Sequence, residues 1–227
     1  MNPPGLRGHS PIAGLHDAAE SRSADYMEQA PEHIKRITVY ASSSNGLDAC
    51  YYDAAARLGT TLGRAGLDVI YGGGGVGLMR DMANNAMAAG AHVHGVIPGF
   101  LNTVEHGHKG LSHLEVVNDM RERKHRMIEG SNAVICLPGG SGTLEEVFEV
   151  LTLKRLGQYL GPVILVNTKR YYDGFVGFLE HAVSERFMSE RHLQMWSLVD
   201  EPEQVIEALH TAVEWTAEAR KFAAVRD

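Results

Sequence analysis

Short apolar runs alternate with amphipathic stretches along the chain from Lys35 onward. The apolar runs have the length of buried strands and cover residues 37–41, 68–71, 93–97, 133–137 and 163–166. Between and after them, apolar residues recur at helical spacing over residues 49–65, 78–89, 119–129, 144–156 and 172–186, and again from residue 202. This alternation predicts an α/β fold in which a parallel sheet carries helices on both faces.

The N-terminal stretch does not share this pattern. It is polar, contains prolines at positions 3, 4, 11 and 31, and shows no sustained periodicity. We expect residues 1–33 to form a mobile extension and residues 34–227 to form a single domain. The stretch lacks the apolar region of a signal peptide, and no window of the chain reaches transmembrane length, so we expect no membrane partner.

The composition narrows the class of protein further. With 227 residues, of which 44% are hydrophobic and 22% charged, the chain is long and apolar enough for one globular domain with a sizeable core. The net charge of -7 gives no general basic field, which disfavours nucleic acid as a partner. Cys50 and Cys136 stand in separate predicted elements, which favours a reducing, cytoplasmic location over a disulfide scaffold.

Residues 138–146, with the sequence PGGSGTLEE, join a predicted strand to a predicted helix. The glycines of this loop let backbone N–H groups approach an anion, and the positive end of the helix dipole favours negative charge there. We expect Thr143 to cap the helix, with Glu145 and Glu146 on its first turn. The sequence therefore predicts a phosphate site beside two carboxylates.

A purely structural role is open for part of the same segment. Thr143 and Glu146 have the spacing of a capping box, in which the glutamate serves only to stabilise the helix. A cap needs one small or polar residue, however, and three glycines approach this helix. The capping alternative therefore leaves the glycine loop unexplained.

A second glycine cluster follows the predicted strand over residues 68–71. Gly72, Gly74 and Gly77 have the G-x-G-x-x-G spacing of a dinucleotide-binding turn. The acidic residue expected about twenty positions later is missing, because residues 92–97 read HVHGVI. The chain also lacks the G-x-x-x-x-G-K-[ST] motif, which argues against a P-loop NTPase.

The order of the predicted strands places two loops together. We expect the first three strands to follow one another outward in the sheet, and the strand over 133–137 to pair with the other side of the first strand. The strand order then changes direction between the first strand and the strand over 133–137, and ligands of open α/β sheets bind at such a point. The loops over 41–46 and 138–143 would face each other there. Arg123 and Lys124 precede the second loop by one helix and one strand and can return to the same crevice, whereas Arg121 and Arg126 fit a solvated helix face.

The twelve histidines include two H-x-H pairs, at positions 92/94 and 106/108. Neither pair is accompanied by a cysteine or carboxylate at zinc spacing. We therefore expect no metal centre, and nothing in the sequence calls for a cofactor.

Three motifs occur in the order in which one family has them. Residues 73–79, GGGVGLM, fall in a G-G-G-x-x-G-L-M segment, residues 120–124 match M-x-x-R-K, and residues 138–146 match P-G-G-x-G-T-x-x-E. From about residue 36 to 207 the chain resembles the Lonely Guy family, cytokinin riboside 5'-monophosphate phosphoribohydrolases that are often labelled lysine decarboxylases. The resemblance implies a Rossmann-like, doubly wound sheet and an enzyme, usually dimeric, that hydrolyses the N-glycosidic bond of N6-substituted adenosine monophosphate.

The resemblance also assigns site residues. The essential pair falls on Arg123 and Glu146. A carboxylate beside the sugar stabilises an oxocarbenium-like state and orients water, while a guanidinium stabilises the charge on the leaving purine. We expect substrate contacts from Ser43, Gly74, Met79, Glu105, Lys124, Gly139, Gly140, Ser141, Gly142, Thr143, Glu145 and Thr152. The resemblance implies the contact from Thr152, and the helix spacing agrees with it, because Thr152 lies seven residues after Glu145 on nearly the same face.

The chain departs from the family pattern in one segment. Where the family usually has T-W-x-Q-L-G-x-H-x-K-P, residues 152–162 read TLKRLGQYLGP. The preferred N6 substituent and the mode of dimerisation therefore stay open, although we expect a homodimer or a multiple of dimers.

Two other functions stay open beside release of a cytokinin base. One is a broader purine 5'-monophosphate nucleosidase acting at the same site. The other is a non-catalytic carrier of the molybdenum cofactor, which would need the phosphate loop but not Glu146 paired with Arg123. A pyridoxal-phosphate lysine decarboxylase is disfavoured, since no lysine stands in a suitable setting for a Schiff base.

Overall fold

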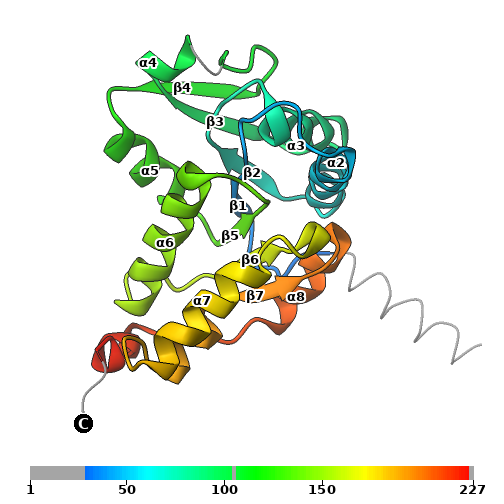
Figure 1. Ribbon diagram of the computed structural model, residues 1–227. Coiled ribbons are helices and arrows are strands. Elements are labelled where there is room, and N and C mark those ends of the chain that lie inside the picture. Colours follow the sequence, from blue (N-terminus) through cyan, green and yellow to red (C-terminus); the bar gives the residue numbers. More distant parts are fainter. Residues whose placement is uncertain (1–28, 104–105, 225–227) are drawn as a thin grey trace, which may run out of the picture.

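The computed structural model describes residues 29–103 and 106–224, which form a three-layer α/β arrangement (Figure 1). Its centre is a seven-stranded sheet in which all neighbouring strands pair in parallel, in the order β4-β3-β2-β1-β5-β6-β7. The strands are β1 (Arg36–Tyr40), β2 (Asp68–Tyr71), β3 (Val93–Pro98), β4 (His113–Val117), β5 (Ala133–Cys136), β6 (Val163–Val166) and β7 (Ser197–Val199).

Helices cover both faces of this sheet. The α-helices are α2 (Ala49–Arg64), α3 (Gly77–Ala88), α4 (Gly99–Asn102), α5 (Met120–Ile128), α6 (Ser141–Arg155), α7 (Asp173–Ser184) and α8 (Val205–Thr211). Four 3-10 turns accompany them: η1 (Thr168–Arg170), η2 (Glu190–Met195), η3 (Pro202–Gln204) and η4 (Ala217–Phe222). In Figure 1, α2 and α3 lie on one side of the sheet and α5 and α6 on the other.

The alternation of side chains along the strands produces two hydrophobic cores. Ile37 and Val39 of β1 pack into the core shared with α2, α3 and α8, while Tyr40 packs into the core shared with α5, α6 and α7. All residues of β5 and β6 are buried, because helices cover a parallel sheet on both sides. This burial explains why the central strands are continuous apolar runs in the sequence.

The predicted α/β architecture is confirmed, and β2 and β6 have the predicted bounds. Two strands are absent from the sequence prediction. β4 reads HLEVV and lies at the sheet edge, so its polar residues break the apolar run, and β7 has only three residues. The helix predicted from residue 202 begins as the 3-10 turn η3 before α8.

The reversal of strand order also lies at the predicted place. β1 pairs with β2 on one side and with β5 on the other, so the chain crosses the sheet between these strands. Residues 41–46 leave the carboxyl end of β1, and residues 137–140 leave that of β5. These two loops frame the crevice described below.

Most of the predicted N-terminal extension, residues 1–28, lies outside the described residues. Within the part of the chain that is described, no helix has the length and apolar character needed to cross a membrane.

Candidate active site

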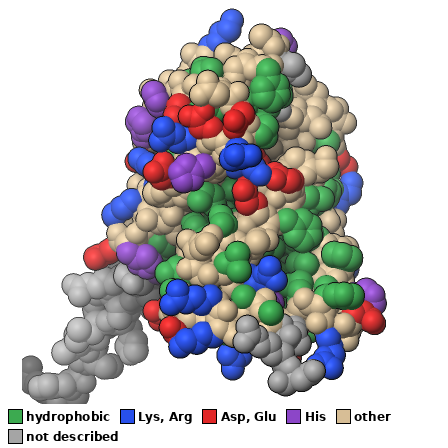
Figure 2. All heavy atoms as spheres, turned by 90° about the vertical axis from the view of Figure 1, so that its left-hand side faces the viewer, with side chains coloured by type: hydrophobic (Ala, Val, Ile, Leu, Met, Phe, Trp, Pro, Cys, Tyr) green, Lys and Arg blue, Asp and Glu red, His purple; other side chains and the backbone are tan. Residues whose placement is uncertain are grey.

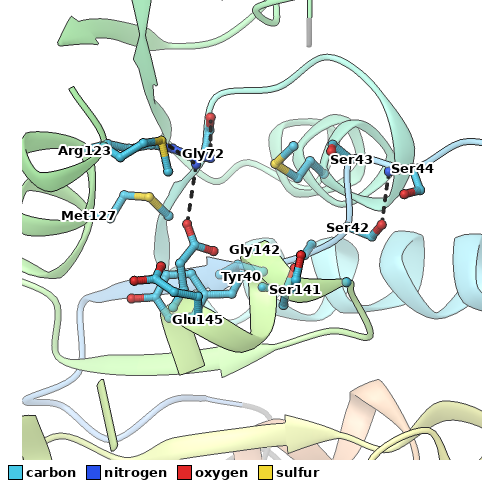
Figure 3. Close-up of a pocket in the computed structure, with 17 residues that line it drawn as sticks. Tyr40, Ser42, Ser43, Ser44, Gly72, Arg123, Met127, Ser141, Gly142 and Glu145 are labelled. Atoms are coloured by element: carbon cyan, nitrogen blue, oxygen red, sulfur yellow. Dashed lines mark hydrogen bonds and ion pairs between the residues drawn. The ribbon is translucent and has the colours of Figure 1, made fainter. Parts of the chain in front are cut away.

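A cavity of about 270 Å³ opens at the carboxyl ends of β1, β2 and β5 (Figure 3). It lies at the reversal of strand order, and it is built from four segments far apart in the sequence. Its walls are formed by Val39, Tyr40, Ala41, Ser42, Ser43, Ser44, Gly72, Met79, Met120, Arg123, Met127, Gly140, Ser141, Gly142, Thr143, Glu145 and Glu146.

One wall of the cavity is the N-terminus of α6. The helix begins at Ser141 with Gly140 as its N-cap, and no side chain among the described residues caps this end through a hydrogen bond. The first N–H groups of a helix have no partner within the helix, and they carry the positive end of its dipole. Residues 140–143 line the cavity, so this wall has the geometry that the predicted anion site requires.

The expected capping role of Thr143 is wrong. Thr143 is the third residue of α6 rather than its cap, and it is buried. A Cβ added at Gly139 would overlap the Thr143 side chain, so the glycine makes room for Thr143 beneath the loop. Glu145 and Glu146 consequently stand on the second turn, and Glu146 is too far along the helix to complete a capping box.

Glu146 faces Arg123 across the cavity. Arg123 Nη1 lies 3.5 Å from Glu146 Oε1, and each side chain is only 8% exposed. The Arg123 guanidinium is held from behind by the strand ends, because Nε donates to Val96 O at 3.2 Å and Nη2 donates to Gly72 O at 3.1 Å. A Cβ at Gly72 would overlap this guanidinium, so a larger residue there would displace Arg123 from its place.

The N–H groups that follow the second glycine cluster, residues 72–77, bind the loop after β1 rather than being available for a phosphate. At the start of α3, the N–H groups of Leu78 and Met79 donate to Ser42 O at 3.0 and 3.3 Å. The N–H of Gly77 donates to Asn45 Oδ1 at 3.3 Å. Since these donors are used internally, the G-x-G-x-x-G spacing marks a packing contact that presents residues 42–44 to the cavity.

Comparison with known proteins identifies the family. A family model described as "Possible lysine decarboxylase" matches residues 79–209. A cytokinin riboside 5'-monophosphate phosphoribohydrolase of Oryza sativa subsp. japonica is 43% identical over 157 residues, which cover 69% of this chain and 65% of that protein. The enzyme of the same name from Rhodococcoides fascians is 42% identical over 162 residues, 71% of this chain and 82% of that protein. The chain belongs to the Lonely Guy family.

A solved structure shows the same fold at greater sequence distance. The molybdenum cofactor carrier protein of Chlamydomonas reinhardtii matches with a TM-score of 0.60 and 20% identity, over 79% of this chain and 98% of that one. This likeness supports the Rossmann-like α/β fold of the Lonely Guy family member described here.

The structure brings most of the expected site residues into the cavity. Arg123 and Glu146 line it together with Ser43, Met79, Gly140, Ser141, Gly142, Thr143 and Glu145. Gly139 lies against the Thr143 side chain but does not itself line the cavity. Glu105 lies outside the described residues.

Three expected contact residues lie elsewhere in the single chain. Lys124 points to the outer side of α6, where its Nζ lies 2.5 Å from Glu145 Oε1 and 3.2 Å from Glu149 Oε2. Gly74 forms a β-bridge with Gly107 instead of lining the cavity. Thr152 lies on nearly the same face of α6 as Glu145, but it is two turns farther from the cavity and is exposed in a separate small groove between α6 and α7.

Sequence reasoning missed the floor and one side wall of the cavity. Tyr40, the last residue of β1, forms part of the floor, and Met120 and Met127 of α5 line the side. Burial, followed by the charge of Glu146, raises the pKa of Tyr40 well above its ordinary value. The signal for Tyr40 was its place at the carboxyl end of the first strand, where ligands bind in such sheets.

Proposed function

We propose that this chain hydrolyses the N-glycosidic bond of adenosine 5'-monophosphate or an N6-substituted form of it. The two products are the free base and ribose 5-phosphate. The base is an active cytokinin when the substrate carries a cytokinin N6 substituent. The printed names of the relatives support this activity. The observation that carries it is the buried Arg123–Glu146 pair in the same cavity as the uncapped N-terminus of α6.

The N-terminus of α6 is suited to the 5'-phosphate. Backbone N–H groups and the helix dipole attract the anion, and the Ser141 and Thr143 hydroxyls are additional donors. A phosphate bound there places the ribose deeper in the cavity, toward Glu146 on the second turn of the same helix. Holding the sugar in this way removes much of the entropic cost of reaching the transition state.

Glu146 and Arg123 then divide the chemistry. As the C1'–N9 bond breaks, its electron pair leaves with the purine and positive charge develops on the sugar. The Glu146 carboxylate stabilises that charge and accepts a proton from the water that attacks C1'. Transfer of this proton to the departing purine gives the neutral free base and restores the carboxylate. The Arg123 guanidinium, oriented by Gly72 O and Val96 O, stabilises the negative charge on the departing base.

A comparison of substrates tests the proposal. The purified protein is incubated with AMP, GMP, CMP, N6-isopentenyl AMP and adenosine, and the released base and ribose 5-phosphate are quantified by chromatography. We expect cleavage of AMP or its N6-isopentenyl form, and much slower cleavage of adenosine, which lacks the phosphate. Equal rates on AMP and adenosine would contradict the phosphate site, and no base from any nucleotide would contradict the hydrolase.

The same experiment decides between the narrower and the broader activity. Comparable rates on AMP and GMP would identify a general purine 5'-monophosphate nucleosidase. The carrier alternative is supported by the shared fold, but passive binding would not need Glu146 paired with Arg123.

We also propose that the protein assembles as a homodimer or a multiple of dimers through the α6 and α7 surface. Phe148 of α6 is 41% exposed and Phe178 of α7 is 61% exposed, and Phe148 stacks edge-on against Phe175 at 5.2 Å. Figure 2, which faces the side of the molecule bearing α5 and α6, shows hydrophobic side chains exposed below a band of charged and histidine residues. Thr152 lies in the groove beside Phe148, which would place it at this interface.

Sedimentation of the wild type and of Phe178→Glu at micromolar concentration tests the assembly. We expect a dimer-based species for the wild type and dissociation of the variant, because a charge would be buried without a partner. A monomeric and fully active wild type would contradict the proposed assembly.

The cytoplasmic location stays a prediction.

A further inference from the structure

Two consecutive tyrosines hold the backbone of the phosphate loop from outside the cavity. The Tyr171 hydroxyl donates a hydrogen bond to Gly139 O at 2.5 Å, and the Tyr172 hydroxyl donates to Leu137 O at 2.8 Å. Neither tyrosine lines the cavity. Both therefore contact the loop between β5 and α6 without facing the cavity.

The bond to Gly139 determines where the next N–H points. In a trans peptide the C=O and N–H groups point in opposite directions. Tyr171 fixes the Gly139 carbonyl outward, so the Gly140 N–H of the same peptide plane is directed away from Tyr171. Gly140 lines the cavity, which makes this N–H a donor for the anion that binds there.

The loop needs such an anchor because of its own composition. Gly139 and Gly140 flank this peptide bond, and glycine populates a wider range of backbone conformations than any other residue. Without the Tyr171 hydroxyl, the peptide between them could rotate and turn its carbonyl toward the substrate. A carbonyl oxygen facing a phosphate is repulsive, and one N–H donor is lost.

The turn that carries Tyr171 is itself firmly held. Lys169 and Arg170 have φ values of 56° and 59°, a left-handed conformation that is strained for residues with a side chain. Asn167 Oδ1 accepts from the Tyr172 N–H at 2.7 Å, and Lys169 Nζ lies 2.6 Å from Asp48 Oδ2 on the cap of α2. Such strain persists only where the surrounding contacts fix it.

We propose that Tyr171 is a positioning residue for the substrate phosphate, acting through the Gly139–Gly140 peptide. This rests on the proposed phosphate site at α6. It predicts that loss of the hydroxyl weakens recognition of phosphate-bearing ligands specifically, while the carboxylate and guanidinium that act on the glycosidic bond keep their places.

The test compares Tyr171→Phe with Tyr51→Phe. Tyr51 is the matched control because its ring meets the Tyr171 ring edge-on at 6.2 Å, and its hydroxyl has no hydrogen bond within the described residues. For Tyr171→Phe we expect KM for AMP to rise about tenfold, the loss typical of one hydrogen bond to a charged group, with kcat changed less than about threefold. Calorimetry should show a similar weakening of ribose 5-phosphate binding.

Adenosine separates positioning from general damage. Its kcat/KM, measured at high enzyme concentration, should be the same for Tyr171→Phe and the wild type, because it carries no phosphate. Unchanged AMP KM and ribose 5-phosphate binding, or equal losses on adenosine and AMP, would overturn the proposal. If the wild type hydrolyses nothing, the proposed function fails, but the ribose 5-phosphate dissociation constants of the two variants still test the role of Tyr171.

Discussion

Arg123 of α5 and Glu146 of α6 meet across the cavity with 3.5 Å between Nη1 and Oε1, and both side chains are 8% exposed. Taking two charges out of water costs several kcal/mol per ion, and their attraction often does no more than offset that cost. A buried ion pair of this kind is therefore weak evidence for stability. Its position beside the proposed anion site favours a chemical role instead.

Replacing Glu146 by Gln separates the charge of this residue from its shape. If the carboxylate stabilises the oxocarbenium-like state, kcat on AMP should fall by about a hundredfold or more, as for loss of a preorganised electrostatic group. The melting temperature should stay near that of the wild type. The control is Glu149→Gln, a more exposed carboxylate of α6 that pairs with Lys124. Near-normal kcat in Glu146→Gln would contradict the role proposed for the carboxylate charge in the reaction.

Arg123→Lys keeps the positive charge but removes the guanidinium. A lysine ammonium cannot reproduce the fixed donors that bond Gly72 O and Val96 O while facing Glu146. We expect kcat/KM for AMP to fall by about a hundredfold, in the range of a lost oriented donor in a buried site. In Arg123→Ala, added guanidinium ion should restore part of the rate more effectively than ammonium. Full activity of Arg123→Lys would show that charge alone suffices.

Gly72→Ala tests the packing behind Arg123. The added methyl group would overlap the guanidinium, which must then shift from Glu146. We expect a loss of kcat with the fold retained, visible as a normal circular dichroism spectrum. Gly177→Ala is the control, since a Cβ there in α7 meets nothing within 4 Å and should stabilise the helix by about 0.5–1 kcal/mol. Equal activity of Gly72→Ala and Gly177→Ala would contradict this arrangement.

The burial of Lys154 in α6 should make the stability of the protein depend on pH. Its side chain is 2% exposed, its Nζ donates to Gly161 O at 2.6 Å, and burial lowers its pKa to about 8 from 10.5. The folded state thus loses this proton before the unfolded state does. Between pH 8 and 10.5 the unfolded chain binds more protons here, so this group makes stability rise with pH.

The variant Lys154→Met isolates that contribution, because other titrating groups cancel in the difference. The free energy of unfolding of the wild type minus that of Lys154→Met should increase by about 2 kcal/mol between pH 7 and 9.5. Urea unfolding at several pH values measures it. A difference that is constant with pH would mean that the lysine has an ordinary pKa in the folded protein.

The hydrophobic pattern of the chain is sufficient to predict most of the fold. The central strands are apolar runs because both faces of a parallel sheet are covered, and amphipathic periodicity marks the helices between them. Edge elements are harder to predict, since β4 is half exposed and carries His113 and Glu115 within the strand. The identity of β4 as a strand depends on pairing with β3, a long-range contact that local pattern does not record.

For the candidate site, the order of residues is sufficient to predict the family, the glycine loop before α6, and Arg123 and Glu146 as the candidate catalytic pair. Each of these features belongs to a motif that is continuous in the sequence, so it can be recognised without the fold. The fold is needed to see which of the two glycine clusters has backbone N–H groups available for an anion. The α3 N–H groups are used by Ser42 and Asn45, whereas no side chain of the described residues caps α6. The first residue of a helix and the partners of its first N–H groups depend on residues from other parts of the chain. The position of Thr143 within α6 and the contact of Tyr171 with Gly139 therefore become apparent only in the fold.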